Sequence, residues 1–240
     1  MNPDSLVTTS WDDGHPLDFK IAELMAKYNL NGTFYIPKNN VENQVMDETM
    51  IVQLSKLFEI GGHTINHLSF DQVNLKKWEE EVNSCYIWLK EITVEAPISF
   101  CFPRGKYNSL AADAVFRGGF KLARTTELMN FKNPRGLGII PTTIQIYDHS
   151  SLTYFIHLLK RRKIANLFFW VTNNSEKQLD RLVDKYLAQV IATKGCLHIW
   201  RHSWEIEKYG LWNKLESVFS RISGITEVKY VPNKYLATAN

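Results

Sequence analysis

The chain has 240 residues, of which 45% are hydrophobic, 22% charged and 12% aromatic, so it can bury a sizeable core and is neither disordered nor fibrous. Its 28 basic and 25 acidic residues leave a formal net charge of +3, which is too balanced for a protein whose main activity is wrapping nucleic acid. Cys85, Cys101 and Cys196 form no C-x-x-C pair, which argues against a disulfide framework and against a cysteine zinc site.

The hydropathy of the chain shows no apolar run near the roughly 18 residues needed to span a bilayer, and no basic segment followed by an apolar one at the start. We therefore expect a cytoplasmic protein without a transmembrane segment. The densest basic run, residues 160–163, follows an apolar stretch and is interpreted as the end of a helix, where cations offset the helix dipole. The oligomeric state leaves no signal in the sequence.

Short β-rich runs alternate with amphipathic segments over most of the length, which is typical of an α/β protein with a mainly parallel sheet. The predicted strands are residues 6–10, 32–36, 59–63, 98–102, 122–125, 143–147, 167–172 and 196–200. The predicted helices are residues 17–28, 47–58, 72–92, 109–117, 150–162, 176–191 and 210–222. Because no linker or repeat interrupts this alternation, we expect one domain over residues 1–240, folded as a single closed or nearly closed barrel of seven or eight βα units.

Two adjacent carboxylates follow the first predicted strand, in the sequence S-W-D-D-G. In a βα barrel the chemistry sits at the carboxyl ends of the strands, where Asp12 and Asp13 would lie. Adjacent acids repel each other, and bringing both near one pocket is favourable if a cation neutralises one and leaves the other to act as a base. Gly14 permits a tight turn here, and an exposed turn or helix N-cap is the alternative interpretation.

Two histidines, His63 and His67, follow a Gly-Gly pair at the end of the third predicted strand. Their i, i+4 spacing places both imidazoles on one face if this turn is helical. Two neutral imidazoles and one carboxylate make a three-ligand site with room for water, the arrangement of a catalytic zinc.

A third histidine, His202, follows the last predicted strand. An imidazole with a reference pKa near 6.5 gives and takes protons around neutrality, so His202 suits proton delivery at the mouth of a barrel. A loop histidine without a role in the chemistry is the alternative.

Taken together, these segments resemble the polysaccharide deacetylase family, also called the NodB-homology or carbohydrate esterase family 4 domain. S-W-D-D-G is similar to the family motif T-F-D-D-G, and H-T-I-N-H matches the motif H-[ST]-x-x-H. The resemblance implies an α/β fold, a single distorted (β/α) barrel with about seven βα units. It also implies a divalent metal held by Asp13, His63 and His67, with Asp12 as general base.

The third family motif, R-x-P-[YF]-G, is matched only in part by C-F-P-R-G, in which Cys101 stands where the family has arginine. The resemblance assigns oxyanion binding to the backbone N–H of Arg104. In the family the missing arginine orients the base aspartate, and Arg124 is a candidate to replace it or to contact substrate. The last family motif assigns the general-acid role to His202, and Trp204 is a candidate for substrate contact.

The function that the resemblance implies is removal of an N-acetyl group from an amino sugar in a polysaccharide, an oligosaccharide or a glycan precursor. Asp12 would act as base, a water on the metal as nucleophile and His202 as acid. Zinc is the first choice for the metal, and cobalt, nickel or iron also suit these ligands. Two alternatives stay open: a related metal-dependent amidase or deformylase acting on a non-acetyl or non-sugar C–N bond, and a non-catalytic carbohydrate-binding module.

Overall fold

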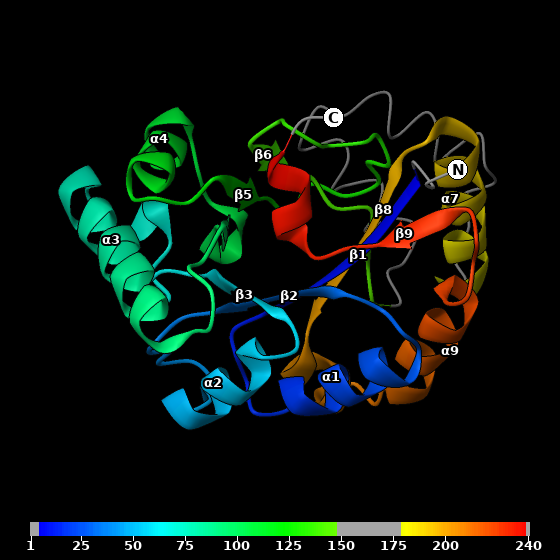
Figure 1. Cartoon of the computed structure of the whole chain (residues 1–240). Coiled ribbons are helices and arrows are strands. Elements are labelled where there is room, and N and C mark those ends of the chain that lie inside the picture. The colour runs from blue at the N-terminus through cyan, green and yellow to red at the C-terminus, as the bar shows by residue number, and fades with distance from the viewer. Residues whose placement is uncertain (1–4, 148–178, 239–240) are drawn as a thin grey trace.

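The computed structural model describes residues 5–147 and 179–238, and its helices enclose a curled sheet of parallel strands (Figure 1). The strands are β1 Ser5–Asp12, β2 Gly32–Ile36, β3 Glu59–Gly62, β4 Ser99–Cys101, β5 Leu122–Arg124, β6 Ile139–Ile140, β7 Ile144–Gln145, β8 Cys196–His202 and β9 Val228–Tyr230. The α-helices are α1 Asp18–Lys27, α2 Glu48–Ser55, α3 Leu75–Ile92, α4 Ser109–Arg117, α7 Leu179–Thr193, α8 Ser203–Lys208 and α9 Trp212–Ile222. Three short 3₁₀-helices are η1 Phe70–Gln72, η2 Pro103–Gly105 and η3 Asn233–Ala237.

Strand β1 is the centre of the sheet, whose order is β6-β5-β4-β3-β2-β1-β8-β7. One edge of β1 pairs with β8 along its length, and the other edge is shared by β2 near its carboxyl end and β9 near its amino end. Figure 1 shows α3 and α4 on one side of this sheet, α1 and α2 beneath it, and α7 and α9 on the side away from α3. The predicted α/β barrel is confirmed, and within the described ranges no pairing joins β6 to β7.

Most predicted elements lie within a few residues of the observed ones, and those predicted at 32–36 and 109–117 have the expected bounds. The prediction missed β6, β9 and α8, because elements of two, three and six residues are too short to display a period. The strand predicted at 167–172, the helix at 150–162 and the basic run at 160–163 lie outside the described residues.

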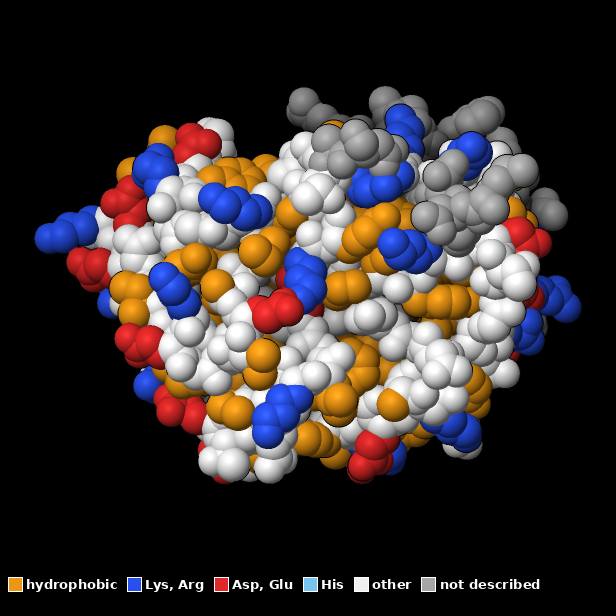
Figure 2. Space-filling view, in the orientation of Figure 1, with side chains coloured by type: hydrophobic (Ala, Val, Ile, Leu, Met, Phe, Trp, Pro, Cys, Tyr) orange, Lys and Arg blue, Asp and Glu red, His pale blue; other side chains and the backbone are white. Residues whose placement is uncertain are grey.

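The distribution of charge on the surface and the polarity of the helices agree with the near-balanced charge and the hydropathy of the sequence. Lysines and arginines are interspersed with acidic side chains over the face shown in Figure 2, as the near-balanced charge leads one to expect. Within the described ranges, each helix is either too short or too polar to cross a bilayer.

The amino-terminal end of the sheet is closed by η3, drawn in red in Figure 1. The buried Asn233 side chain accepts a hydrogen bond from Thr8 Oγ1 (2.8 Å) and donates one to the Tyr35 hydroxyl (2.9 Å). Its backbone N–H donates to Thr33 Oγ1 (2.9 Å). These bonds fasten η3 to β1 and β2 from inside the barrel, so polar groups fill this end of the barrel with their hydrogen bonds satisfied.

His198 on β8 lies inside the barrel as a neutral imidazole. Its Nδ1–H donates to the Pro141 carbonyl (3.1 Å), and its Nε2 accepts from the Ser10 hydroxyl (2.9 Å). Burial, aided by the charge of Arg124, lowers the pKa of His198 to about 3. The unfolded chain, with the ordinary pKa of 6.5, therefore binds a proton below pH 6.5 that the folded chain does not bind until pH falls to about 3.

This difference predicts that acid destabilises the fold through His198. Between pH 7.5 and pH 5 the group should lower the free energy of unfolding by roughly 2 kcal/mol, and His198→Gln should remove this component while lowering the stability at both pH values. Urea unfolding of both proteins at the two pH values measures it. An unaltered pH dependence in His198→Gln would contradict the burial of a neutral imidazole.

Candidate active site

The carboxyl ends of β1, β3, β4 and β8 surround a pocket of about 670 Å³. The residues that line it include seven of the eight predicted site residues, and Arg124 lies outside the lining. The lining consists of Asp12, Asp13, Glu42, Asn43, His63, His67, Phe102, Arg104, Thr126, Leu128, Gln145, Trp200, His202, Trp204 and Lys208. Residues from opposite ends of the chain therefore meet at one end of the sheet, as expected for parallel strands.

The turn after β1 aims Asp13 into the pocket. Asp13 and Gly14 both have left-handed backbone conformations, with φ of 77° and 63°, which costs a non-glycine residue of the order of 1 kcal/mol. The Asp13 Oδ1 atom is buried and accepts no hydrogen bond, and it lies 3.5 Å from His63 Nε2 and 3.1 Å from His67 Nε2. Burial would raise the pKa of Asp13, but the contacts with the two histidines and the charge of His202 lower it well below its usual range.

The turn that carries the two histidines is not helical, so the helical interpretation of their spacing was wrong. Thr64 and His67 have left-handed backbones, with φ of 58° and 57°, and the chain folds back so that the two imidazole centroids lie 5.0 Å apart. Helix α3 holds this turn, because the fully buried Glu81 side chain accepts from the backbone N–H of Asn66 (2.9 Å) and from its side-chain amide (2.8 Å).

Glu81 is a site-supporting residue that the sequence reasoning missed. It lies on the buried face of α3, with Trp78 and Val82, where an amphipathic pattern places apolar side chains. A single carboxylate on an otherwise apolar helix face could have indicated this role, since a buried charge needs a specific partner.

Both imidazoles present their Nε2 atoms to Asp13 because their Nδ1 atoms are turned to other groups. The Nδ1–H of His63 donates to the Cys101 carbonyl (2.8 Å), and Nδ1 of His67 lies 3.8 Å from Glu42 Oε2. The hydrogen bond to Cys101 fixes the tautomer of His63, as outer partners do for histidines that ligate a metal. One carboxylate oxygen without a hydrogen bond and two Nε2 atoms thus converge in a donor set that fits a divalent ion such as zinc.

A second group of donors, Asp12, His63 and Cys101, also lies close together. It suits a metal less well, because burial raises the pKa of the Cys101 thiol and the Arg124 guanidinium already bonds Asp12. The set built on Asp13 is therefore the better candidate.

Asp12 is held by a hydrogen bond from the buried side chain of Arg124. Nη2 of Arg124 donates to Asp12 Oδ1, and the Cys101 thiol lies 3.8 Å from Oδ2. The guanidinium lies 4.7 Å from the Trp200 ring centroid and 5.3 Å from that of Tyr35, and its side chain has no exposed surface. This placement fits the hypothesis that Arg124 replaces the motif arginine. A direct contact between Arg124 and substrate stays a prediction, and the side chain lies outside the pocket lining.

The register of β4 and β5 explains how Arg124 reaches this position. Cys101 and Arg124 are paired residues of the two parallel strands. A cation on β5, one strand away from the position of the motif arginine, therefore meets Asp12. Burial would lower the pKa of Arg124, but the carboxylate of Asp12 raises it further above its usual range.

His202 faces both aspartates from the end of β8, where it is the register partner of Asp12. Its Nε2 lies 3.9 Å from Asp12 Oδ2 and 3.9 Å from Asp13 Oδ2, and its Nδ1 lies 2.5 Å from Glu205 Oε2. Burial by itself lowers the pKa of His202, but the bond to Glu205 and the charges of Asp13 and Asp12 raise it above its usual value. Glu205 lies in the first turn of α8, and the sequence analysis did not identify it as a partner of His202. Its spacing of three residues from His202 was the feature of the sequence that could have indicated the contact.

The mouth of the pocket is formed by η2 on one side and α8 on the other. Arg104 in η2 has a left-handed backbone, with φ of 57°, and its exposed side chain forms an ion pair with Glu42. Trp204 in α8 donates from Nε1 to Asp13 Oδ2 (2.9 Å) and keeps part of its ring exposed to the pocket. Trp204 therefore contacts the proposed metal ligand and also offers an aromatic face.

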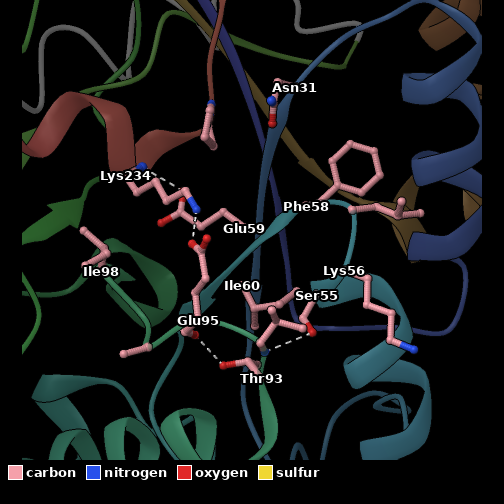
Figure 3. Close-up of a pocket in the computed structure, with 14 residues that line it drawn as sticks. Asn31, Ser55, Lys56, Phe58, Glu59, Ile60, Thr93, Glu95, Ile98 and Lys234 are labelled. Atoms are coloured by element: carbon pink, nitrogen blue, oxygen red, sulfur yellow. Dashed lines mark hydrogen bonds and ion pairs between the residues drawn. The ribbon is translucent and has the colours of Figure 1, made fainter.

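A second pocket, of about 220 Å³, lies at the opposite end of the strands (Figure 3). Lys234 and Glu95 form an ion pair beside it, and the buried Glu59 accepts from Thr33, Ser99 and the Lys234 backbone N–H. Within the described part of the chain, groups of donors close enough to hold a metal occur only in the first pocket. The chemistry is therefore assigned there.

Comparison with known proteins identifies the family of the chain. Residues 1–123, just over half of the chain, match the polysaccharide deacetylase family, and the chain belongs to that family. No curated protein sequence matches the chain.

Two solved structures with TM-scores above 0.5 show the same fold. A polysaccharide deacetylase described as putative from Mycobacterium smegmatis is 12% identical, with 99% of this chain and 90% of that chain covered and a TM-score of 0.68. A family 4 carbohydrate esterase from Streptomyces lividans in complex with acetate is 12% identical over 94% of this chain and 91% of that chain, with a TM-score of 0.57. The Streptococcus pyogenes deacetylase PplD, in complex with acetate, is 20% identical over 56% of this chain, which spans 62% of that protein, with a TM-score of 0.48.

The two donor sets make a direct prediction about metal binding. In metal-stripped protein, Asp13→Ala should weaken zinc binding by roughly 100-fold or more, because it removes one of three donors, whereas Cys101→Ser should leave it nearly unchanged. Titration calorimetry of both variants measures the affinity. Equal weakening by the two substitutions would show that the donor set around Asp12 takes part.

Proposed function

We propose that this chain is a divalent-metal-dependent hydrolase that removes the N-acetyl group of an amino sugar, and that it does so as one domain over residues 1–240. The observation that carries the proposal is the division of the two adjacent aspartates between two environments. Asp13 faces two imidazole nitrogens, whereas Asp12 is bonded to Arg124 and lies beside His202. Membership of the polysaccharide deacetylase family and the acetate bound to the Streptomyces lividans esterase support the acetyl group.

The metal would be held by Asp13, His63 and His67. A divalent ion bound there lowers the pKa of water toward neutrality and polarises a carbonyl oxygen. The zinc identity rests on the two imidazoles and one carboxylate, which cobalt, nickel and iron also accept. A cytoplasmic location remains a prediction of the sequence.

Asp12 acts as general base. Its Oδ1 is fixed by Arg124, so Oδ2 is the oxygen that faces the pocket side, near His202, and accepts the proton of the attacking water. The backbone N–H of Arg104 donates to the oxyanion that forms when the amide carbonyl is attacked. A single donor placed in this way contributes roughly 3 kcal/mol to the stability of the transition state.

His202 acts as general acid and protonates the departing amine. Glu205 supports this role, because its bond to Nδ1 orients the ring and raises the pKa of the imidazole above its usual value. The products are acetate and a free amino sugar. The partly exposed ring of Trp204 offers a surface on which a sugar can stack.

The test is acetate release from a panel of N-acetylated sugars and chito-oligomers, with metal-stripped protein to which zinc or cobalt is added. We expect release that depends on the metal, and a loss of at least roughly 100-fold in Asp12→Asn, which keeps the metal donors. Zinc binding to Asp12→Asn, measured separately, is the control. Stoichiometric metal binding without acetate release from any member would count against the acetyl group and favour another amide; absence of metal binding would favour a binding module.

A second prediction concerns the arginine on β5. Arg124→Met should lower kcat by roughly 10-fold to 100-fold with little change in KM, because it leaves the buried Asp12 without its partner. The double variant Cys101→Arg, Arg124→Cys, which puts the cation in the position used by the family, should recover part of this loss. Circular dichroism and thermal unfolding confirm that each variant folds. An unchanged kcat in folded Arg124→Met would exclude the orienting role.

A further inference from the structure

Helix α8 presents two side chains to the pocket from successive turns. Trp204 and Lys208 are four residues apart, so they lie on one face of the helix, and both line the pocket. The Lys208 Nζ lies 6.0 Å from the Trp204 ring centroid and 5.6 Å from that of Tyr209. A sugar stacked on Trp204 would therefore have an ammonium group beside it.

Lys208 differs from the other charged residues of the lining in its partners. Arg104 is paired with Glu42, Asp12 with Arg124, and Asp13 lies against two histidines. Lys208, in contrast, forms no ion pair with an acidic residue in the described part of the chain; its contacts there are the two aromatic rings.

The carboxylates near Lys208 are engaged elsewhere. Glu205 bonds His202 and lies 3.2 Å from Arg201 Nε, and Glu207 accepts from the indole N–H of Trp212. Among residues 5–147 and 179–238, the ammonium group thus has no carboxylate paired with it, and an anionic ligand could bind it without displacing a bond described there.

The net charge of the pocket also favours an anionic ligand. The three carboxylates of the lining, Asp12, Asp13 and Glu42, are balanced by Arg104, Lys208 and the underlying Arg124. Binding of a divalent cation to Asp13 and the two histidines would leave the pocket with an excess of positive charge. An uncharged sugar gains nothing from that excess, whereas an anionic one is attracted and steered into the pocket.

We propose that Lys208 and Trp204 form a subsite for an anionic group on the acetylated sugar, a carboxylate or a phosphate, with the ring on Trp204 and the anion on Lys208. This inference rests on the proposed function and names the class of its substrate as an acidic N-acetylated sugar. Because Lys208 is exposed, its contact with an anion should be worth a few-fold in kcat/KM, as exposed ion pairs are.

The test compares three sugars that share one acetamido group: N-acetylglucosamine, its uronic acid, and its 1-phosphate. The wild-type protein should show a higher kcat/KM for at least one of the two anionic sugars than for the neutral one, and the better of the two identifies the anion. Lys208→Met should lower the ratio of anionic to neutral kcat/KM by about threefold, and Lys208→Arg should retain most of it. Raising the NaCl concentration to 0.5 M should reduce the same ratio.

Lys76→Met, on the exposed first turn of α3, is the matched control because it removes the same charge away from the pocket. It should leave the ratio unchanged, and an equal fall in both variants would overturn the subsite by pointing to net charge alone. A ratio that does not respond to Lys208→Met would also overturn it.

Binding of the deacetylated sugars to the metal-loaded protein, followed by calorimetry, separates this inference from the proposed function. Turnover of neutral sugars with no preference for anions would leave the deacetylase and overturn the subsite. Binding of the anionic amino sugars that is weakened by Lys208→Met, without turnover of any acetylated sugar, would leave the subsite and overturn the deacetylase.

Discussion

The repulsion between two adjacent carboxylates at the end of the central strand is the constraint on which the rest of the site depends. Asp12 and Asp13 are both buried, and two negative charges this close are tolerated only if each has its own compensation. Asp13, whose backbone is left-handed, directs its Oδ1 to the two imidazoles, whereas Oδ1 of Asp12 meets Arg124. The two carboxylates therefore have different partners: Asp13 lies against two imidazoles, and Asp12 is bonded to a guanidinium.

The backbone around the pocket is held in place by contacts from neighbouring elements. Thr64, His67 and Arg104 adopt left-handed backbones like that of Asp13, and conformations of this kind persist only where neighbouring structure imposes them. Glu81 supplies part of that structure from α3, by bonding the backbone and side chain between the two histidines. Strain concentrated in the loops at one end of the sheet is what a site built on a rigid scaffold is expected to show.

Arg124 on β5 reaches Asp12 from the position paired with Cys101 on β4, where the motif that the chain resembles has its arginine. A parallel pair places the two positions side by side, so either strand can carry the cation that reaches Asp12. The thiol of Cys101 is small and, with its raised pKa, uncharged, so it adds no second charge beside the guanidinium. The partial match to the third motif is thus compatible with an intact orienting contact.

The sequence by itself determined the α/β class, most of the strands and helices, and the segments that carry the donors. It could do so because hydrophobic period and glycine-bounded polar runs are local properties of the chain. It did not determine how those segments meet. The non-helical turn at His63 and His67, the bond from Arg124 to Asp12, and the supporting carboxylates Glu81 and Glu205 depend on tertiary structure. The physical reason is that left-handed turns are imposed by distant contacts, and the register of parallel strands joins residues far apart in the chain.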